Sequence, residues 1–241
     1  MRIALVFLVA LTFGIACREH KTEDPPVKSD LDTIHTDTLV GQLQETPSLV
    51  PPLESMPDTA FIRLADYSSE FAYDLRYATT YNFMKAQVYD CPQCYTRVKT
   101  ARALIEANRE FMEQGVRIRF FDCYRPNSVQ YRMWEIVPNP QYVANPQKGS
   151  IHNKGGAVDI TLETLEGLPL DMGTDFDFFG KRAYHDNTDL SEEILANRLL
   201  LKETMEKHGF WSIRTEWWHY NLRAASNDPV ADFKWPCPPE P

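Results

Sequence analysis

A change of composition near residue 58 limits the fold more than any other feature of the sequence. Between residue 18 and about residue 58 the chain is rich in Pro, Glu, Asp, Ser and Thr, with neither a helical nor a strand period. Such a segment buries too little apolar surface to fold, so we expect residues 18–58 to be a disordered tether. The fold must then be built from residues 59–241, a single domain long enough to enclose a hydrophobic core.

The first 17 residues predict an export signal. They read MRIALVFLVALTFGIAC, in which Arg2 precedes an apolar run and small residues precede Cys17. The run is shorter than the ~20 apolar residues of a membrane-spanning helix. A cysteine after small residues resembles a bacterial lipoprotein signal. We therefore expect an exported protein of the cell envelope or periplasm, attached to a membrane only through a lipid on Cys17. A plain secreted protein is the alternative.

The charge balance excludes one class of partner. The chain carries 34 acidic and 25 basic residues, for a formal net charge of -9. Nucleic-acid binding needs a basic surface, so we expect no nucleic-acid partner. The sequence implies no protein partner either.

The cysteines that remain after Cys17 predict disulfides, because their number is even and the protein is exported. They allow three pairings, which the sequence leaves open: Cys91, Cys94, Cys123 and Cys237. The CPQC stretch lacks the second close pair that a zinc ribbon needs. It also lies in a polar loop, so a redox dithiol at the start of a helix is not favoured.

Hydrophobic periodicity predicts helices and strands that do not alternate regularly. Two long amphipathic patterns, each ending in a glycine, predict helices at 96–115 and 189–209, with a short helix at 127–137. Strands are expected within 71–83, at 116–124 and 157–165, and as a final strand or bent hairpin at 210–222. This order favours an α+β fold over a doubly wound sheet. The proline-containing loop 138–149 is long enough to act as a lid.

A histidine and an aspartate flank two glycines in the stretch SIHNKGGAVDITL. A turn at Gly155 and Gly156 would bring His152 back toward Asp159, which begins a strand. A catalytic zinc takes three protein ligands and leaves one position open, and His219 in TEWWHYNL supplies the third. We therefore predict one zinc ion per chain, bound by His152, Asp159 and His219.

Glu216, three residues before His219, is the predicted general base and acid. An unligated carboxylate beside a metal-activated water takes its proton and later delivers it to the leaving amine. Trp217 and Trp218 are expected to line the site, and the apolar surroundings that they provide should raise the pKa of Glu216. Each motif alone is a weak signal, because such pairs arise by chance and a WWHY stretch more often belongs to a core.

Taken together, these motifs resemble those of the D-alanyl-D-alanine dipeptidases. SIHNKGGAVDITL resembles the family's Ser-x-His-x-x-Gly-x-Ala-x-Asp motif, EWWHY its second motif, and FDCYRP its Tyr-Arg-Pro stretch. DLRYATTYNF and MGTDFDFF look like two further segments, so the similarity runs from about residue 60 to residue 235. It implies a central, mainly antiparallel sheet flanked by helices, as in zinc D,D-peptidases and hedgehog-like domains.

The resemblance also implies the roles of individual residues. The family's zinc ligands and general base fall on the four residues predicted above. Arg125 matches the arginine that stabilises the transition state. Cys123, two residues earlier, is not part of the resemblance, and a disulfide there would hold the arginine rigid. Ser150, Tyr77 and Asp177 match positions near the substrate. Asp177 is a candidate for binding the ammonium group of the substrate, with a helix or turn cap as the alternative.

The expected reaction is hydrolysis of D-alanyl-D-alanine to two molecules of D-alanine. One alternative is a zinc D,D-carboxypeptidase or another peptidoglycan peptidase, which uses the same metal chemistry on longer peptides. A second alternative is a zinc-stabilised binding module of the cell envelope without turnover. The presence of both Glu216 and Arg125 speaks against this module, because binding alone requires neither.

Overall fold

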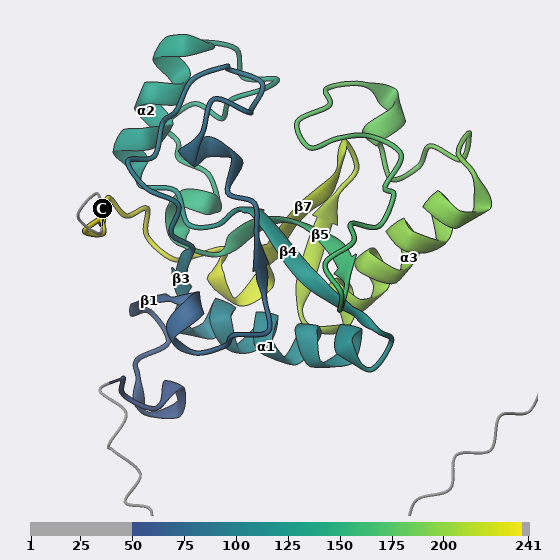
Figure 1. The fold of residues 1–241 in the computed structure, drawn as a ribbon. Helices are drawn as coiled ribbons and strands as arrows, with labels where there is room; N and C mark the ends of the chain where they lie inside the picture. Colours follow the sequence, from purple (N-terminus) through teal and green to yellow (C-terminus); the bar gives the residue numbers. More distant parts are fainter. Residues whose placement is uncertain (1–49, 238–241) are drawn as a thin grey trace, which may run out of the picture. The chain divides into compact units, whose positions relative to one another are not determined.

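A five-stranded sheet forms the centre of the structure, a computed structural model that describes residues 50–237 (Figure 1). The strand order is β2-β4-β5-β7-β6, with β2 parallel to β4 and the other neighbours antiparallel. The strands are β2 (Ala72–Tyr73), β4 (Val116–Asp122), β5 (Ala157–Thr164), β6 (Phe210–Ile213) and β7 (Glu216–Leu222). A separate small sheet pairs β1 (Phe61–Arg63) with β3 (Tyr95–Arg97). The predicted α+β class and the mainly antiparallel central sheet are confirmed.

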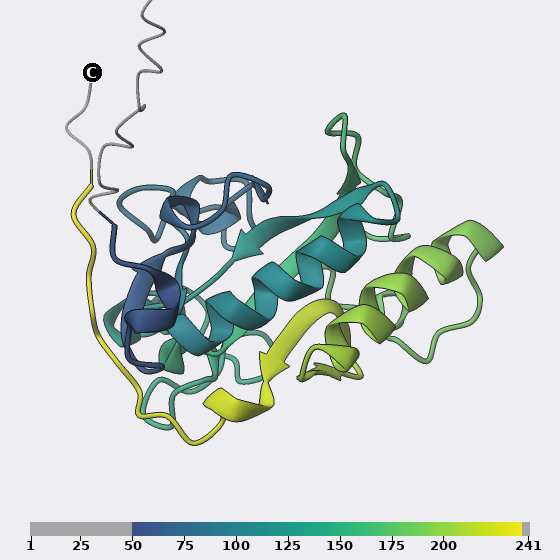
Figure 2. The same cartoon turned by 90° about the horizontal axis from the view of Figure 1, so that it is seen from below.

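Two long helices, α1 (Val98–Met112) and α3 (Glu192–Lys207), lie across one face of this sheet (Figure 2). Leu104 of α1 and Ile160 of β5 are fully buried in the same hydrophobic core. Side chains alternate along a strand, so Asp159, the neighbour of Ile160, points to the opposite face. The sheet therefore has one apolar face under the helices and one face that is free to carry a polar site.

The predicted helices form with small shifts at their ends. The 96–115 pattern becomes α1, and Gly115 beyond its end has a left-handed φ of 77°. The 189–209 pattern becomes α3, whose N-cap is Ser191: its hydroxyl accepts a hydrogen bond from the amide of Ile194. The short helix α2 (Asn127–Ile136) lies on the side of the sheet away from α1 (Figure 1).

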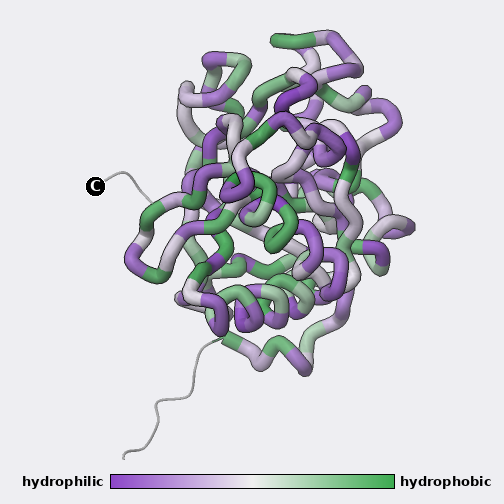
Figure 3. The backbone as a smooth tube through the Cα atoms, turned by 90° about the vertical axis from the view of Figure 1, so that its right-hand side faces the viewer, coloured by the Kyte–Doolittle hydropathy of each residue, from purple (hydrophilic) through white to green (hydrophobic). Residues whose placement is uncertain are grey.

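Two strand predictions are refined by the structure. The 210–222 segment is a hairpin of β6 and β7 rather than one strand. Within 71–83 only β2 is extended, because Arg76–Ala78 forms a 3-10 turn. Coloured by hydropathy, hydrophobic stretches run through the middle of the described part, whereas many outer turns are hydrophilic (Figure 3).

The disulfide pairing that the sequence leaves open is Cys91–Cys237 and Cys94–Cys123. The first bond joins the C-terminal segment to the loop before β3. In that segment the Trp235 ring stacks on Tyr95, with ring centroids 5.1 Å apart.

The packed structure begins upstream of the predicted boundary at residue 58. Leu53 is buried, and its carbonyl oxygen accepts a hydrogen bond from the Arg102 guanidinium at 2.7 Å. The predicted leader 1–17, with Cys17, and most of the predicted tether lie outside the described residues. Among the residues described, none of the helices has the length and apolar character needed to cross a membrane.

Candidate active site

Sheet register brings two of the predicted metal ligands together. Asp159 of β5 lies directly opposite His219 of β7 in the antiparallel ladder. Directly opposed residues of neighbouring strands have Cβ atoms about 4.5–5.5 Å apart, so their side chains can reach one ion. His152 comes from the 3-10 turn His152–Lys154, just before β5.

The turn between His152 and Asp159 depends on both glycines. Gly155 has a left-handed φ of 72°, and a Cβ there would lie 2.6 Å from the Phe61 ring. A Cβ on Gly156 would lie 2.4 Å from the Cβ of Ala225. The predicted turn is thus confirmed, although only Gly155 needs the unusual backbone angle; Gly156 is needed for close packing.

Three ligand atoms form a compact triangle. His152 Nε2 lies 3.2 Å from His219 Nδ1 and 3.3 Å from Asp159 Oδ1, and the latter two atoms are 2.9 Å apart. Tetrahedral zinc with bonds of about 2.0–2.1 Å has ligand atoms about 3.3 Å apart. Within residues 50–237 this is the one group of three or more His, Cys, Asp or Glu side chains that could hold a metal. The residues present therefore fit a zinc ion.

The second nitrogen of each imidazole is already bound to an acceptor. His152 Nδ1 donates to the carbonyl oxygen of Cys123 at 2.8 Å, and His219 Nε2 donates to Asn221 Oδ1 at 2.9 Å. A neutral imidazole has one N–H, so these hydrogen bonds leave His152 Nε2 and His219 Nδ1 with free lone pairs. Such outer partners orient metal-binding histidines in proteins.

Charges in this cluster stabilise one another in the metal-free state. Burial alone would raise the pKa of Asp159, but the imidazoles of His152 and His219 hold it well below its usual value. Burial would lower the pKa of His219, yet Asp159 raises it, because the carboxylate accepts a hydrogen bond from Nδ1 when the imidazole is protonated. The site thus contains a firmly ionised carboxylate, which suits a cation.

Glu216, the first residue of β7, lies in the cavity of about 280 Å³ that the ligand triangle lines. Burial raises the pKa of Glu216, and the negative charge of Asp159 adds to the increase. Trp218 also lines this cavity, as predicted. Trp217 does not: its Nε1 donates to Thr174 Oγ1 at 2.7 Å, and its ring lines a neighbouring cavity. The expectation that both tryptophans wall the site was wrong for Trp217, because the two side chains diverge.

Arg125 reaches the same cavity from the loop after β4. Its Nε and Nη2 donate to Asp122 Oδ2 at 3.1 and 2.6 Å, and its Nη1 donates to Gln130 Oε1 at 2.9 Å. Although burial opposes a charge here, Asp122 keeps the pKa of Arg125 well above its usual value. The guanidinium is therefore charged and fixed in orientation.

The three predicted substrate-binding residues also line this cavity. The Tyr77 hydroxyl donates to Asp177 Oδ1 at 3.1 Å, whereas the buried Oδ2 of Asp177 has no hydrogen-bond partner. Asp177 has a left-handed φ of 61°, and burial, with the charge of Asp159, raises its pKa well above the usual value. Ser150 Oγ donates to Asn153 Oδ1 at 3.1 Å. All eight predicted site residues thus come together.

Sequence reasoning missed the residues that hold these groups in place. Asp122 and Gln130 fix Arg125, and Asn221 fixes His219. The spacing of Asn221 was a usable signal, because residues i and i+2 of a strand share a face. Asp122 lies in the FDCYRP motif but was not singled out, because nothing local shows that a carboxylate three residues before an arginine bonds to it.

Comparisons with known proteins identify relatives that match most of the chain. Residues 58–236 match a family model described as D-ala-D-ala dipeptidase. A D-alanyl-D-alanine dipeptidase of Escherichia coli (strain K12) is 31% identical over 179 residues, covering 74% of this chain and 93% of the relative. The dipeptidase of Enterococcus faecalis is 29% identical over 186 residues, with coverages of 68% and 92%.

A solved structure shows a weaker likeness. A D,D-pentapeptidase from a vancomycin-resistance cassette, in complex with Zn(II), aligns with a TM-score of 0.37 and 16% identity. The alignment covers 54% of this chain and 73% of the other, and so loose a likeness carries no argument. The match over residues 58–236 and the 31% identity to a relative covered almost throughout confirm the predicted resemblance: this chain belongs to the D-Ala-D-Ala dipeptidase family of metallopeptidases.

Proposed function

We propose that this protein binds one zinc ion through His152, Asp159 and His219 and hydrolyses D-alanyl-D-alanine to two molecules of D-alanine. The observation that carries the proposal is the meeting, in one cavity of about 280 Å³, of the ligand triangle with Glu216, Arg125 and Asp177. When bound, a zinc ion at such a site activates water and polarises a carbonyl.

Glu216 is the proton carrier of the proposed reaction. A general base works best when its pKa lies near the working pH, and burial shifts the pKa of this carboxyl upward, toward neutrality. Glu216 is not part of the ligand triangle, so its oxygens are free to accept a proton from the attacking water. It then gives that proton to the amine that leaves as the peptide bond breaks.

Arg125 stabilises the negative charge that develops on the carbonyl oxygen. Three of its five N–H groups are engaged by Asp122 and Gln130, which leaves two for the substrate. A donor that is already oriented and charged needs no reorganisation during the reaction. Lysine could not replace it, because an ammonium lacks the planar fork.

Asp177 binds the free ammonium group of the dipeptide. Its Oδ2 is buried without a partner, and its raised pKa reflects how costly an unpaired charge is there. A cation next to this oxygen would remove that cost and supply the missing hydrogen bond. Tyr77 holds the other oxygen and so fixes the direction of the carboxyl group.

Loop 138–149 supports a preference for short peptides. Pro140, Gln141 and Tyr142 line the cavity, and the Tyr142 ring packs against the ring of Phe179, which also lines it, with centroids 4.5 Å apart. We propose that this contact closes one side of the cavity to the additional residues of a longer peptide.

The decisive experiment compares two substrates with the zinc-loaded full chain. We expect D-alanine release from D-Ala-D-Ala, little release from a stem pentapeptide ending in D-Ala-D-Ala, and no release after a chelator removes zinc. Equal cleavage of the pentapeptide would favour a D,D-carboxypeptidase. Zinc binding without hydrolysis of either substrate would favour a binding module.

We also propose that the protein acts outside the cytoplasm, with Cys17 as its lipid anchor, in turnover of cell-wall fragments. The two disulfides support export, because disulfides persist in oxidising compartments. Metabolic labelling with a radioactive fatty acid tests the anchor: the wild type is expected to be labelled and Cys17→Ala is not. Labelling of neither protein would leave a secreted form without lipid.

A further inference from the structure

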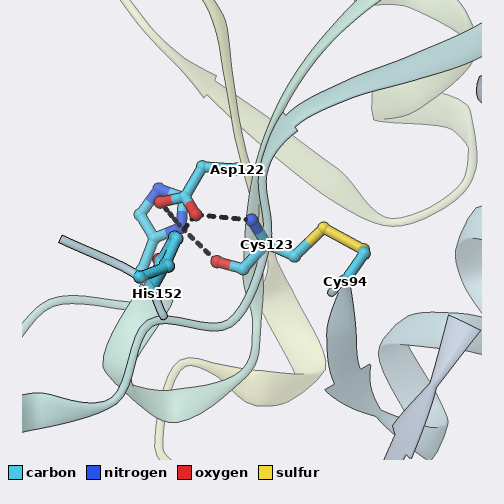
Figure 4. Close-up of a disulfide and its surroundings, with 5 residues drawn as sticks. Cys94, Asp122, Cys123 and His152 are labelled. Carbon is cyan, nitrogen blue, oxygen red and sulfur yellow. Dashed lines mark hydrogen bonds and ion pairs between the residues drawn. A yellow bond between two sulfur atoms is a disulfide. The ribbon is translucent and has the colours of Figure 1, made fainter. Parts of the chain in front are cut away.

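One of the two disulfides lies beside a predicted zinc ligand (Figure 4). Cys94, just before β3, is bonded to Cys123, just after β4, and both residues are buried. The carbonyl oxygen of the same Cys123 accepts the hydrogen bond from His152 Nδ1 at 2.8 Å. A covalent cross-link is thus attached to the residue whose main chain orients the imidazole.

Sheet pairing does not by itself fix this carbonyl. The register between β4 and β5 shifts between Phe120 and Asp122, and β4 ends at Asp122. Beyond that point two hydrogen bonds hold the main chain. The amide of Cys123 donates to Asp122 Oδ1 at 2.9 Å, and the amide of Tyr124 donates to the Tyr95 carbonyl oxygen at 2.9 Å. The disulfide to Cys94, the neighbour of Tyr95, is the covalent part of this attachment.

We propose that the Cys94–Cys123 disulfide is a positioning element of the zinc site, which keeps the Cys123 carbonyl where it fixes the tautomer of His152. With the proton on Nδ1 and donated to this carbonyl, Nε2 presents its lone pair to the metal. If the carbonyl moves, the tautomer with its proton on Nε2 competes, and that nitrogen cannot bind zinc. The inference rests on the proposed zinc site.

Arg125 depends on the same attachment. Its amide donates to the His152 carbonyl at 3.2 Å, and its carbonyl accepts from the Asn153 side chain at 2.8 Å. Movement of Cys123 would therefore displace the arginine relative to the metal site as well as the imidazole.

The other disulfide provides a matched control. In the described part of the chain, neither Cys91 nor Cys237 has a hydrogen bond to a predicted zinc ligand. Removal of the Cys91–Cys237 disulfide therefore shows how the loss of a cross-link affects the protein without a direct effect on a zinc ligand.

The first test compares the full-length variants Cys94→Ala/Cys123→Ala and Cys91→Ala/Cys237→Ala, both shown to be folded by circular dichroism. Zinc is titrated into each metal-free protein against a chromophoric chelator. We expect the zinc dissociation constant to rise about 10- to 100-fold in the first variant, as for loss of an outer partner, and to stay near the wild-type value in the second. Unchanged affinity in the first variant, or equal losses in both, would overturn the inference. A wild type that binds no zinc would instead refute the zinc site itself.

A second test uses the wild type and remains decisive if the first variant does not fold. Coupling is reciprocal, so a disulfide that strengthens zinc binding is itself stabilised by zinc by the same factor. The protein is equilibrated in dithiothreitol redox buffers, with free zinc fixed by a metal buffer. Reduction adds two electrons and two protons to give two thiols, and dithiothreitol closes to its cyclic disulfide.

Alkylation and mass spectrometry then report each disulfide separately. We expect zinc to lower the midpoint potential of Cys94–Cys123 by about 30 mV for each tenfold of coupling. The potential of Cys91–Cys237 is expected to stay constant. No shift, or the same shift in both disulfides, would contradict the positioning role.

Discussion

Replacement of Arg125 by methionine separates transition-state stabilisation from structural support. The guanidinium donates two hydrogen bonds to Asp122 Oδ2, and Asp122 is 1% exposed. In Arg125→Met, Asp122 keeps the Tyr89 hydroxyl and the Cys123 amide on Oδ1, but its Oδ2 loses both donors. The variant therefore carries a buried charge without its counter-ion.

Two losses of different origin follow from this geometry. Removal of one partner from a buried ion pair costs about 3–5 kcal/mol of folding free energy. Removal of one oxyanion donor costs about 2.7–4 kcal/mol of transition-state stabilisation, or about 10²–10³ in kcat. A domain with about 10 kcal/mol of stability, the middle of the usual range of about 5–15 kcal/mol, remains folded after the first loss, so both losses can be measured.

The double variant Asp122→Asn/Arg125→Met distinguishes them. Neutralising Asp122 removes the unpaired charge, so urea unfolding is expected to show that most of the lost stability returns, while kcat for D-Ala-D-Ala stays low. Arg117→Met is the control: it removes one of the two arginines that pair with the buried Glu163, outside the cavity, and should lower stability without lowering kcat. Recovery of kcat in the double variant to within tenfold of wild type would refute the transition-state role of Arg125.

Three further changes test the remaining parts of the site. Glu216→Gln is expected to keep zinc affinity within a few-fold and to abolish turnover, measured by chelator competition and D-alanine release; a normal kcat would exclude its role as base. Asn221→Leu removes the acceptor of His219 Nε2 and should weaken zinc binding about 10- to 100-fold, and unchanged binding would contradict the orienting role. Because the pKa of Asp177 is raised above 3.8, the folded state favours its protonated form, and stability is lost as pH rises above that value. Asp177→Asn should therefore be more stable than the wild type at neutral pH but not below pH 3.8. It should also raise KM for D-Ala-D-Ala but not for the N-acetyl derivative of this dipeptide. Parallel pH profiles of stability, or equal changes of KM for both substrates, would count against the ammonium site.

Local signals in the sequence were sufficient to predict the main helices and strands, whereas they only suggested the residues of the site. The apolar period and the terminal glycine predicted α1, because both depend on residues within one or two turns. The glycine turn that joins His152 to Asp159 is local, so it was predicted from its own stretch. The proposed zinc ligands and Glu216 were suggested by short motifs, and the family resemblance strengthened that prediction. Family resemblance was needed to assign Tyr77 and Asp177, which lie 100 residues apart and meet only through one hydrogen bond.

Only the tertiary structure decided which distant segments contact one another. The register of β5 and β7 places Asp159 opposite His219. The register of β4 and β5 shifts between Phe120 and Asp122, and Cys123 lies beyond their last paired residue. The disulfide pairing likewise depends on which segments become neighbours, as does the hydrogen bond of the buried Trp217 to Thr174. A sequence specifies backbone angles and polarity over a few residues, so it determined the helices and the glycine turn and supplied the residues proposed to bind the metal. The orientation of those groups comes from hydrogen bonds and a covalent bond between remote residues, which exist only once the sheet has closed.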